Sequence, residues 1–233
     1  MTDTVLITGA NRGLGLEMTK QYAQAGWNVV ACCRSPESAL DLSRLIQQFG
    51  DSVSVHPLDV TQFDGIDRLS RELSGRSIDV LINNAGVYGD TTDTAFGNLD
   101  YSCWQHVLAV NTLAPVKMAE AFMPHVSRSN RKLIVSLTSL MGSIADNRGG
   151  GSLMYRSSKA GLNAALKSMA IDLKPRGIGI LIFHPGWVKT DMGGNNAPTS
   201  PEESVRGLQG IIERFRPEDS GRFLDFRGKE LPW

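Results

Sequence analysis

Short apolar runs alternate with helix-length segments along this 233-residue chain, and this alternation constrains the fold more than any other feature. The runs are rich in β-branched residues, and several have no polar interruption, which is typical of strands buried on both faces. Six runs are predicted to be strands: 5–7, 29–33, 53–55, 78–82, 133–135 and 178–183. With helices between them, they predict a single α/β domain with a doubly wound parallel sheet of about seven strands and helices on both faces.

Three long segments do not have the periodicity of a helix or a strand: about 87–99, 143–153 and 187–201. Each follows a predicted strand, so we expect them at the carboxyl edge of the sheet, where open parallel sheets bind ligands. Loops of this length in a compact domain are usually functional. We therefore predict that they are substrate loops within one domain of residues 1–233, because no linker, repeat or charge block divides the chain. Ser35 and Thr61 are predicted to begin two of the helices as caps.

The composition excludes several classes of protein. With 41% apolar and 21% charged residues, the chain is an ordinary globular protein, neither disordered nor collagen-like. The 24 Lys and Arg residues balance the 24 Asp and Glu residues, so no overall field attracts nucleic acid or an anionic membrane. No apolar run approaches the ~20 residues that cross a bilayer. We predict neither nucleic acid nor membrane as a partner.

The cysteines and histidines carry no metal or disulfide pattern. The cysteines are odd in number, and the chain does not begin with a secretory signal, so we predict a cytoplasmic location. The histidines share no metal-ligand spacing, and we predict no metal site. These residues are Cys32, Cys33, Cys103, His56, His106, His125 and His184.

A glycine-rich turn lies between the first predicted strand and the first helix. Glycine makes up 24 of the 233 residues, against a usual share of ~7%. Gly9, Gly13 and Gly15 form a G-x3-G-x-G pattern, which lets backbone N–H groups and a helix N-terminus face a pyrophosphate. The turn does not end in the Gly-Lys-Ser/Thr of a P-loop. It predicts a dinucleotide site.

The second predicted strand indicates which dinucleotide binds. An acidic residue at its end would bind the ribose hydroxyls of NAD, whereas an arginine accommodates the 2′-phosphate of NADP. Here the strand ends at Arg34 with no acid, and Arg12 adds a cation within the glycine turn. The pattern favours NADP(H) over NAD(H), although Arg34 could also be a solvated strand end.

Tyr155 and Lys159 are the candidate proton-transfer pair. Their i, i+4 spacing places them side by side on one helix face. An ammonium beside a phenol favours the phenolate, so we predict that Lys159 lowers the pKa of Tyr155 and makes it a general acid/base. Ser139, at the end of a strand-plus-turn segment, is placed to reach the same pocket. Asn111 is a polar residue among apolar neighbours in the preceding helix.

Two further landmarks complete the pattern: Asn83-Asn84-Ala85-Gly86 after the fourth predicted strand and Pro185-Gly186 after the sixth. In this order, the glycine turn, these landmarks, Asn111, Ser139 and the Tyr155/Lys159 pair resemble the short-chain dehydrogenase/reductase family over the whole chain. The segments 184–194, 221–225 and 231–233 resemble more narrowly the branch of sniffer-type carbonyl reductases and bacterial C-factor proteins.

The resemblance implies a Rossmann-type NAD(P)-binding domain and a role for each matching residue. Tyr155 would protonate the carbonyl oxygen, Lys159 would bind the nicotinamide ribose, and Ser139 would orient the carbonyl. Asn111 would hold a water in the proton relay. The implied cofactor-binding residues are Gly9, Asn11, Arg12, Gly13, Leu14, Gly15, Arg34, Asp59, Val60, Asn84, Ala85, Gly86, Tyr155, Lys159, Pro185, Gly186, Val188 and Thr190.

One spacing departs from the family. Ser139 lies sixteen residues before Tyr155, further than is usual, and the excess falls at Gly149-Gly150-Gly151. Ser136 and Ser143 are therefore alternatives, but Ser139 occupies the position of the family's strand-end serine.

These features predict a reductase that reduces a ketone or aldehyde with NADPH, with Tyr155 as the proton donor. The alternatives are an NAD-dependent alcohol dehydrogenase and a C-factor-like signalling protein that binds a dinucleotide. The resemblance also implies a homo-oligomer, a dimer or tetramer.

Overall fold

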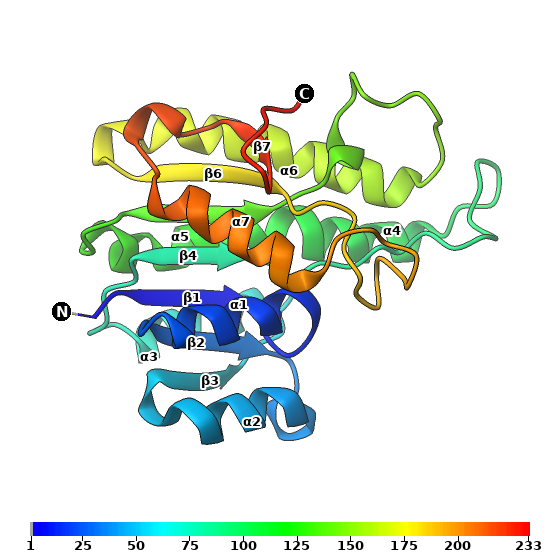
Figure 1. Cartoon of the computed structure of the whole chain (residues 1–233). Coiled ribbons are helices and arrows are strands. Elements are labelled where there is room, and N and C mark those ends of the chain that lie inside the picture. The colour runs from blue at the N-terminus through cyan, green and yellow to red at the C-terminus, as the bar shows by residue number, and fades with distance from the viewer. Residues whose placement is uncertain (1) are drawn as a thin grey trace.

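The computed structural model describes residues 2–233, and seven strands in this range form one parallel sheet (Figure 1). The strands are β1 (Thr4–Thr8), β2 (Asn28–Cys33), β3 (Val53–Pro57), β4 (Val80–Asn83), β5 (Leu133–Leu137), β6 (Gly179–His184) and β7 (Phe223–Asp225). Their order is β3-β2-β1-β4-β5-β6-β7, and every neighbouring pair is parallel. The order reverses between β1 and β4, which opens a crevice at the carboxyl ends of these strands. The predicted fold class is confirmed.

Seven α-helices in the described range connect the strands and cover both faces of the sheet. They are α1 (Gly13–Gln24), α2 (Leu40–Phe49), α3 (Phe63–Glu72), α4 (Tyr101–Leu108), α5 (Ala114–Ser127), α6 (Leu153–Asp172) and α7 (Pro201–Glu213). One apolar core joins α1, α2 and α7 to one face, and a second joins α3, α5 and α6 to the other. Along β1, Val5 and Ile7 belong to the first core and Leu6 to the second, because successive side chains point to opposite faces.

The strands and helix starts differ in places from the prediction. β4 begins at Val80, two residues later than predicted, although the Asp79 backbone still bonds to Thr4 and Leu133 and its carboxylate accepts the backbone N–H of Thr4 (2.9 Å). β7 was not located from the sequence, because its three residues are too few to show a period. The predicted caps are wrong. Ser35 precedes only a 3₁₀ turn and makes no side-chain cap, and Thr61 directs its hydroxyl to Asp59 (2.7 Å).

A wide turn of π-helix, Ala109–Leu113, joins α4 to α5 and carries Asn111. Pro115 explains the turn, because a proline in a regular helix lacks an N–H and its ring collides with the carbonyl four residues earlier. That carbonyl is the one of Asn111. The wider turn avoids the collision and leaves the Asn111 carbonyl without its α-helical donor.

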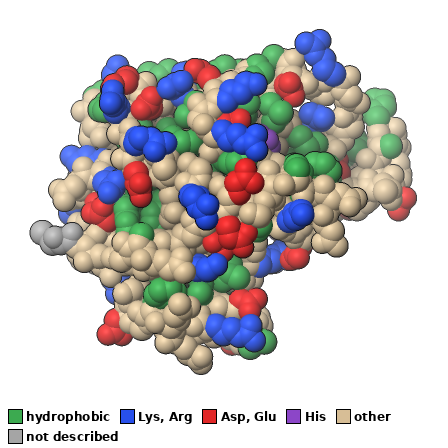
Figure 2. Space-filling model, viewed as in Figure 1, with side chains coloured by type: hydrophobic (Ala, Val, Ile, Leu, Met, Phe, Trp, Pro, Cys, Tyr) green, Lys and Arg blue, Asp and Glu red, His purple; other side chains and the backbone are tan. Residues whose placement is uncertain are grey.

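The segments 84–100, 143–152 and 185–200 contain neither helix nor strand, apart from an isolated bridge between Val188 and Thr199. They follow β4, β5 and β6 and lie at the carboxyl edge of the sheet (Figure 1). Lys and Arg side chains are interspersed with Asp and Glu over the face in Figure 2. No helix in residues 2–233 has the length and apolar character needed to span a membrane.

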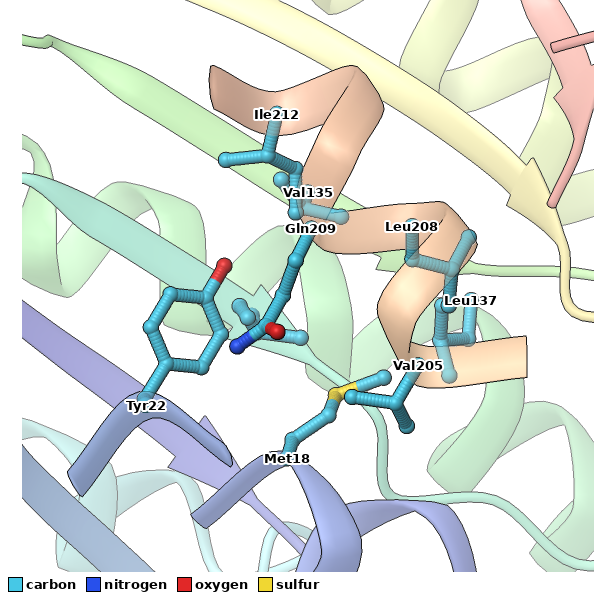
Figure 3. A pocket seen from close by; sticks show the side chains of 9 residues that line it. Met18, Tyr22, Val135, Leu137, Val205, Leu208, Gln209 and Ile212 are labelled. Atoms are coloured by element: carbon cyan, nitrogen blue, oxygen red, sulfur yellow. The ribbon is translucent and has the colours of Figure 1, made fainter. Parts of the chain in front are cut away.

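A small gap between α1 and α7 is part of the core (Figure 3). It is lined by Met18, Tyr22, Val205 and Leu208, among others, and has no space for a water molecule. The Tyr22 hydroxyl at its edge is buried and has no hydrogen-bond partner among the described residues. We therefore do not assign the gap a ligand.

Candidate active site

A cleft of about 460 Å³ opens at the carboxyl edge of the sheet, where the strand order reverses. Most of the residues predicted to bind the cofactor line it: Gly9, Asn11, Arg12, Gly13, Leu14, Arg34, Asp59, Val60, Asn84, Ala85, Gly86, Tyr155, Lys159, Pro185 and Thr190. Five predicted site residues are not among those that line it: Gly15, Asn111, Ser139, Gly186 and Val188. Three of the lining residues not predicted are Val87, Thr138 and Met192.

The glycine turn is held against the end of β4 by a compact hydrogen-bond network. The Thr8 hydroxyl accepts the backbone N–H groups of Asn84 and Ala85 (both 3.1 Å). The Asn84 amide donates to the backbone carbonyls of Thr8 (2.8 Å) and Gly9 (3.1 Å). Asn84 therefore positions the turn, which is a role that its cofactor assignment did not anticipate.

The glycines of the turn have different functions. Gly9 and Gly13 have φ values of +66° and +53°, a left-handed conformation that favours glycine. A side chain at Gly15 would overlap the carbonyl of Gly9, so Gly15 allows the helix to pack on the turn. No side chain caps α1 in the described chain, which leaves its first N–H groups facing the cleft. These N–H groups suit a pyrophosphate.

Two arginines stand at the end of the cleft where the adenosine of a dinucleotide would lie. Arg12 is paired with Asp191 across the cleft (3.1 Å), and both side chains are exposed. Arg34 makes no ion pair or hydrogen bond through its side chain within residues 2–233. Burial raises the pKa of Asp59, but hydrogen bonds from Thr61 and the charge of Arg34 outweigh it and lower that pKa overall. The exposed, unpaired guanidinium of Arg34 fits a phosphate.

The catalytic candidates converge at the other end of the cleft. Lys159 and Tyr155 lie on α6, and the Lys159 Nζ is 5.7 Å from the centre of the Tyr155 ring. Nζ donates a hydrogen bond to the Leu137 carbonyl at the end of β5 (2.9 Å). A methyl group at Gly86 would lie 3.6 Å from Nζ and 3.4 Å from the Asn111 Oδ1, so Gly86 keeps this corner open.

Ser139 is the serine that reaches Tyr155. Its hydroxyl is close enough to that of Tyr155 to act on the Tyr155 pKa, which it lowers, and it also accepts the N–H of Met141 (3.1 Å). The alternatives are engaged elsewhere: Ser136 accepts from Asn83, and Ser143 donates to the Trp233 carbonyl. The longer spacing between Ser139 and Tyr155 is therefore absorbed by the intervening loop.

The Asn111 side chain forms a bridge rather than an open water site. Its Oδ1 accepts the Val87 N–H (2.9 Å), and its Nδ2 donates to the Val87 carbonyl (2.8 Å) and to Ser158 Oγ (3.0 Å). Both N–H groups of the amide are used, and Oδ1 keeps one acceptor position. The Asn111 main-chain carbonyl, which Pro115 leaves without its α-helical donor, is a further acceptor for a water.

Burial shifts the pKa values of the catalytic pair towards their neutral forms. It raises the pKa of Tyr155 to about 12, with a contribution from Tyr88, while the nearby Ser139 hydroxyl acts in the opposite direction. It lowers the pKa of Lys159 to about 8. The prediction that Lys159 lowers the pKa of Tyr155 is wrong for the chain without a cofactor. The ammonium is directed at the Leu137 carbonyl, and desolvation of the phenol dominates.

Sequence reasoning missed Tyr88 and Asp90, which contact the start of α6. The Tyr88 ring packs against that of Tyr155 with 4.8 Å between centres, and the Asp90 carboxylate accepts the Tyr155 backbone N–H (2.8 Å). An acid in a loop that follows a strand carries no distinctive signal, because its partner lies 65 residues away. No three His, Cys, Asp or Glu side chains among residues 2–233 gather closely enough to hold a metal ion.

Comparison with known proteins agrees with this geometry. The family model described as short chain dehydrogenase matches residues 3–201. The chain belongs to the short-chain dehydrogenase family. It is an oxidoreductase of that family, and the predicted resemblance is confirmed.

Individual relatives of this short-chain dehydrogenase support the narrower branch as well. C-signal of Myxococcus xanthus is 44% identical over 156 residues, which cover 67% of this chain and 93% of that protein. The carbonyl reductase Sniffer of D. melanogaster superposes with a TM-score of 0.92 at 32% identity, with both chains fully covered. An NADPH-bound carbonyl reductase from chicken fatty liver gives a TM-score of 0.91 at 31% identity, covering 100% of this chain and 99% of that one.

Proposed function

We propose that this short-chain dehydrogenase is an NADPH-dependent carbonyl reductase that reduces a ketone or aldehyde to an alcohol. The observation that carries the proposal is the buried Tyr155, which lies beside Ser139 and the Lys159 ammonium in a cleft large enough for a dinucleotide. NADPH, when bound, supplies the hydride.

The cleft supports NADPH in two ways. The uncapped N-terminus of α1 and the left-handed Gly9 and Gly13 would hold the pyrophosphate. The unpaired Arg34, with Arg12 nearby, would hold the 2′-phosphate, for which a carboxylate at the end of β2 would be unsuitable. Lys159 would donate to the nicotinamide ribose from the corner that Gly86 keeps open.

Tyr155 holds the proton that the reaction needs. A phenol with a pKa of about 12 stays protonated at neutral pH, so its Oη can donate to a carbonyl oxygen as negative charge develops there. Ser139 would share that oxygen and stabilise the charge. The oxidative alternative would use the same groups in reverse, with the phenolate of Tyr155 as the base.

After Tyr155 has given its proton to the substrate oxygen, a proton would return to the phenolate from a water at the Asn111 carbonyl by way of Lys159. The Lys159 ammonium would be the proton donor nearest to the phenolate on this path. The π turn at Asn111 would fix that water, because it exposes a carbonyl that a regular helix would use internally.

A screen of ketones and aldehydes with NADPH, followed by nicotinamide absorbance, tests the proposal. We expect turnover with a higher kcat/KM for NADPH than for NADH. Tyr155→Phe should keep the NADPH Kd within a few-fold and lose at least ~100-fold in kcat, as for removal of a general acid. Full turnover in that variant would mean that another group donates the proton.

A signalling role is the second candidate, because one of the relatives is named C-signal. Binding alone does not require a buried phenol in contact with Ser139 and flanked by an ammonium. If the screen finds no turnover while NADPH binds, the signalling alternative is favoured.

A further inference from the structure

We propose that Asp90 is a positioning residue for Tyr155: its carboxylate supplies the N-terminal cap that the catalytic helix α6 lacks. The inference rests on the proposed reductase function for its kinetic consequences. Its structural part concerns only how the chain holds Tyr155 in place.

The residues before α6 provide no cap of their own. Helix α6 begins at Leu153, and its N-cap residue Ser152 has a left-handed conformation (φ +48°) and makes no side-chain hydrogen bond to the first turn. Gly150 and Gly151 before it also have positive φ and no side chains. The first N–H groups of a helix need acceptors, and here the local sequence supplies none.

Asp90 supplies the acceptors from a different loop. Its Oδ2 accepts the backbone N–H of Tyr155 (2.8 Å), and its Oδ1 accepts that of Met154 (3.3 Å). A carboxylate at this end of a helix is also favoured by the helix dipole. One of the two capped N–H groups belongs to the catalytic tyrosine itself, so the cap acts on the backbone that carries the phenol.

The loop that carries Asp90 is firmly held. Val87 is fixed through both its N–H and its carbonyl by the Asn111 amide. Gly89 has φ of +79°, and a side chain there would overlap Val107 of α4. Its carbonyl also lies 3.6 Å from the Cys103 Sγ. The segment 87–90 therefore links the helix region of Asn111 to that of Tyr155.

Tyr88 gives the same segment a second hold on α6. Its hydroxyl is 2.8 Å from Ser152 Oγ, and its ring packs on the ring of Tyr155. Asp90 thus holds the backbone of Tyr155, and Tyr88 holds its ring. An error of about 1 Å in the position of a catalytic group reduces the rate by roughly 100-fold, so this hold affects turnover.

The test compares two helix caps of the same chemistry. Asp100 caps α4 by accepting the N–H groups of Ser102 (2.9 Å) and Cys103 (3.0 Å), so Asp100→Ala is the matched control. Asp90→Ala removes the cap of α6, and Asp90→Asn keeps an acceptor oxygen for one N–H group. For each protein we would measure kcat and KM for a carbonyl substrate, the Kd for NADPH, the unfolding midpoint and hydrogen exchange at residues 153–158.

We expect Asp90→Ala to lose roughly 10- to 100-fold in kcat, with the NADPH Kd within two-fold of wild type and faster exchange at Met154 and Tyr155. The kcat and the exchange rates of Asp90→Asn should lie between those of Asp90→Ala and wild type. Asp100→Ala should lower the unfolding midpoint comparably and keep kcat within two-fold, because a merely structural cap would not change the rate.

Two results would overturn the inference. One is unchanged exchange at Met154 and Tyr155 in Asp90→Ala, which would mean that the cap does not hold them. The other is a kcat within two-fold of wild type despite faster exchange, which would mean that the cap does not position the phenol. If wild type shows no turnover at all, the proposed function fails instead, and the exchange data alone decide whether Asp90 holds the helix.

Discussion

Replacing Lys159 by methionine should stabilise this protein while removing its activity. Lys159 is 5% exposed, and burial lowers the pKa of its ammonium from 10.5 to about 8. Since each pH unit corresponds to about 1.36 kcal/mol, the buried charge destabilises the fold at pH 7 by roughly 3 kcal/mol. Methionine has a similar length and no charge, but it loses the hydrogen bond from the ammonium to the Leu137 carbonyl, which contributes about 2 kcal/mol. The expected net gain is about 1 kcal/mol, or roughly 2–4 °C in Tm for a chain of this size.

The sign of the pH dependence makes the prediction specific. The folded-state pKa lies below the unfolded one, so the destabilisation is fully present below about pH 8 and disappears as the pH rises to 10.5. The free energies of unfolding of wild type and Lys159→Met in urea should therefore differ by about 1 kcal/mol at pH 7 and by almost nothing at pH 10. Lys174→Met, at an exposed lysine, is the control and should show no such change. An equal difference at both pH values, or a less stable variant at pH 7, would refute the reasoning.

Three further predictions concern the cofactor and the core. The wild-type affinity for NADPH should weaken as the pH rises above about 8, because Lys159 then loses the proton that makes it a cation. Fluorescence titration from pH 6.5 to 9.5 measures this affinity, and a Kd that does not change with pH would contradict the prediction. Arg34→Ala should lower the ratio of kcat/KM for NADPH over NADH by roughly 10- to 100-fold. Arg44, on α2 and paired with Asp41, is the control, and Arg44→Ala should not change this ratio. An unchanged ratio in Arg34→Ala would mean that Arg34 does not bind the phosphate. Tyr22→Phe should raise the free energy of unfolding by about 1 kcal/mol, because it removes a buried hydroxyl without a partner in the described chain. A lower free energy of unfolding in chemical denaturation would contradict this prediction.

The features that the sequence predicted best are those formed by residues close together in the chain. The apolar runs located six strands, and the spacing of Tyr155 and Lys159 placed both on one side of α6, in the cleft. Gly9 and Gly13 were recognised because a left-handed turn restricts residue choice to very few types. Such features are encoded within a few residues of each other.

Burial, pKa shifts and contacts between distant residues could not be predicted from the sequence, because they depend on tertiary structure. The spacing of Tyr155 and Lys159 does not reveal how deeply they are buried, and burial reversed the expected direction of the Tyr155 pKa. Asp90 was missed because its importance depends on the absence of a cap at Ser152, 62 residues further along the chain. Asn111 was identified from the family pattern, but its side chain proved to bind Val87.

The ion pair between Arg12 and Asp191 has a consequence for how quickly a dinucleotide enters. It joins the glycine turn to the loop after β6 across the cleft, and both side chains are well exposed, at 66% and 78%. An exposed pair of this kind contributes at most ~1 kcal/mol and is weakened by salt. The ion pair across the cleft therefore breaks often, and more often at higher ionic strength. Salt has a second effect, because it screens the long-range attraction between the protein and an anionic cofactor. The association rate of the cofactor therefore reflects two opposing effects of salt.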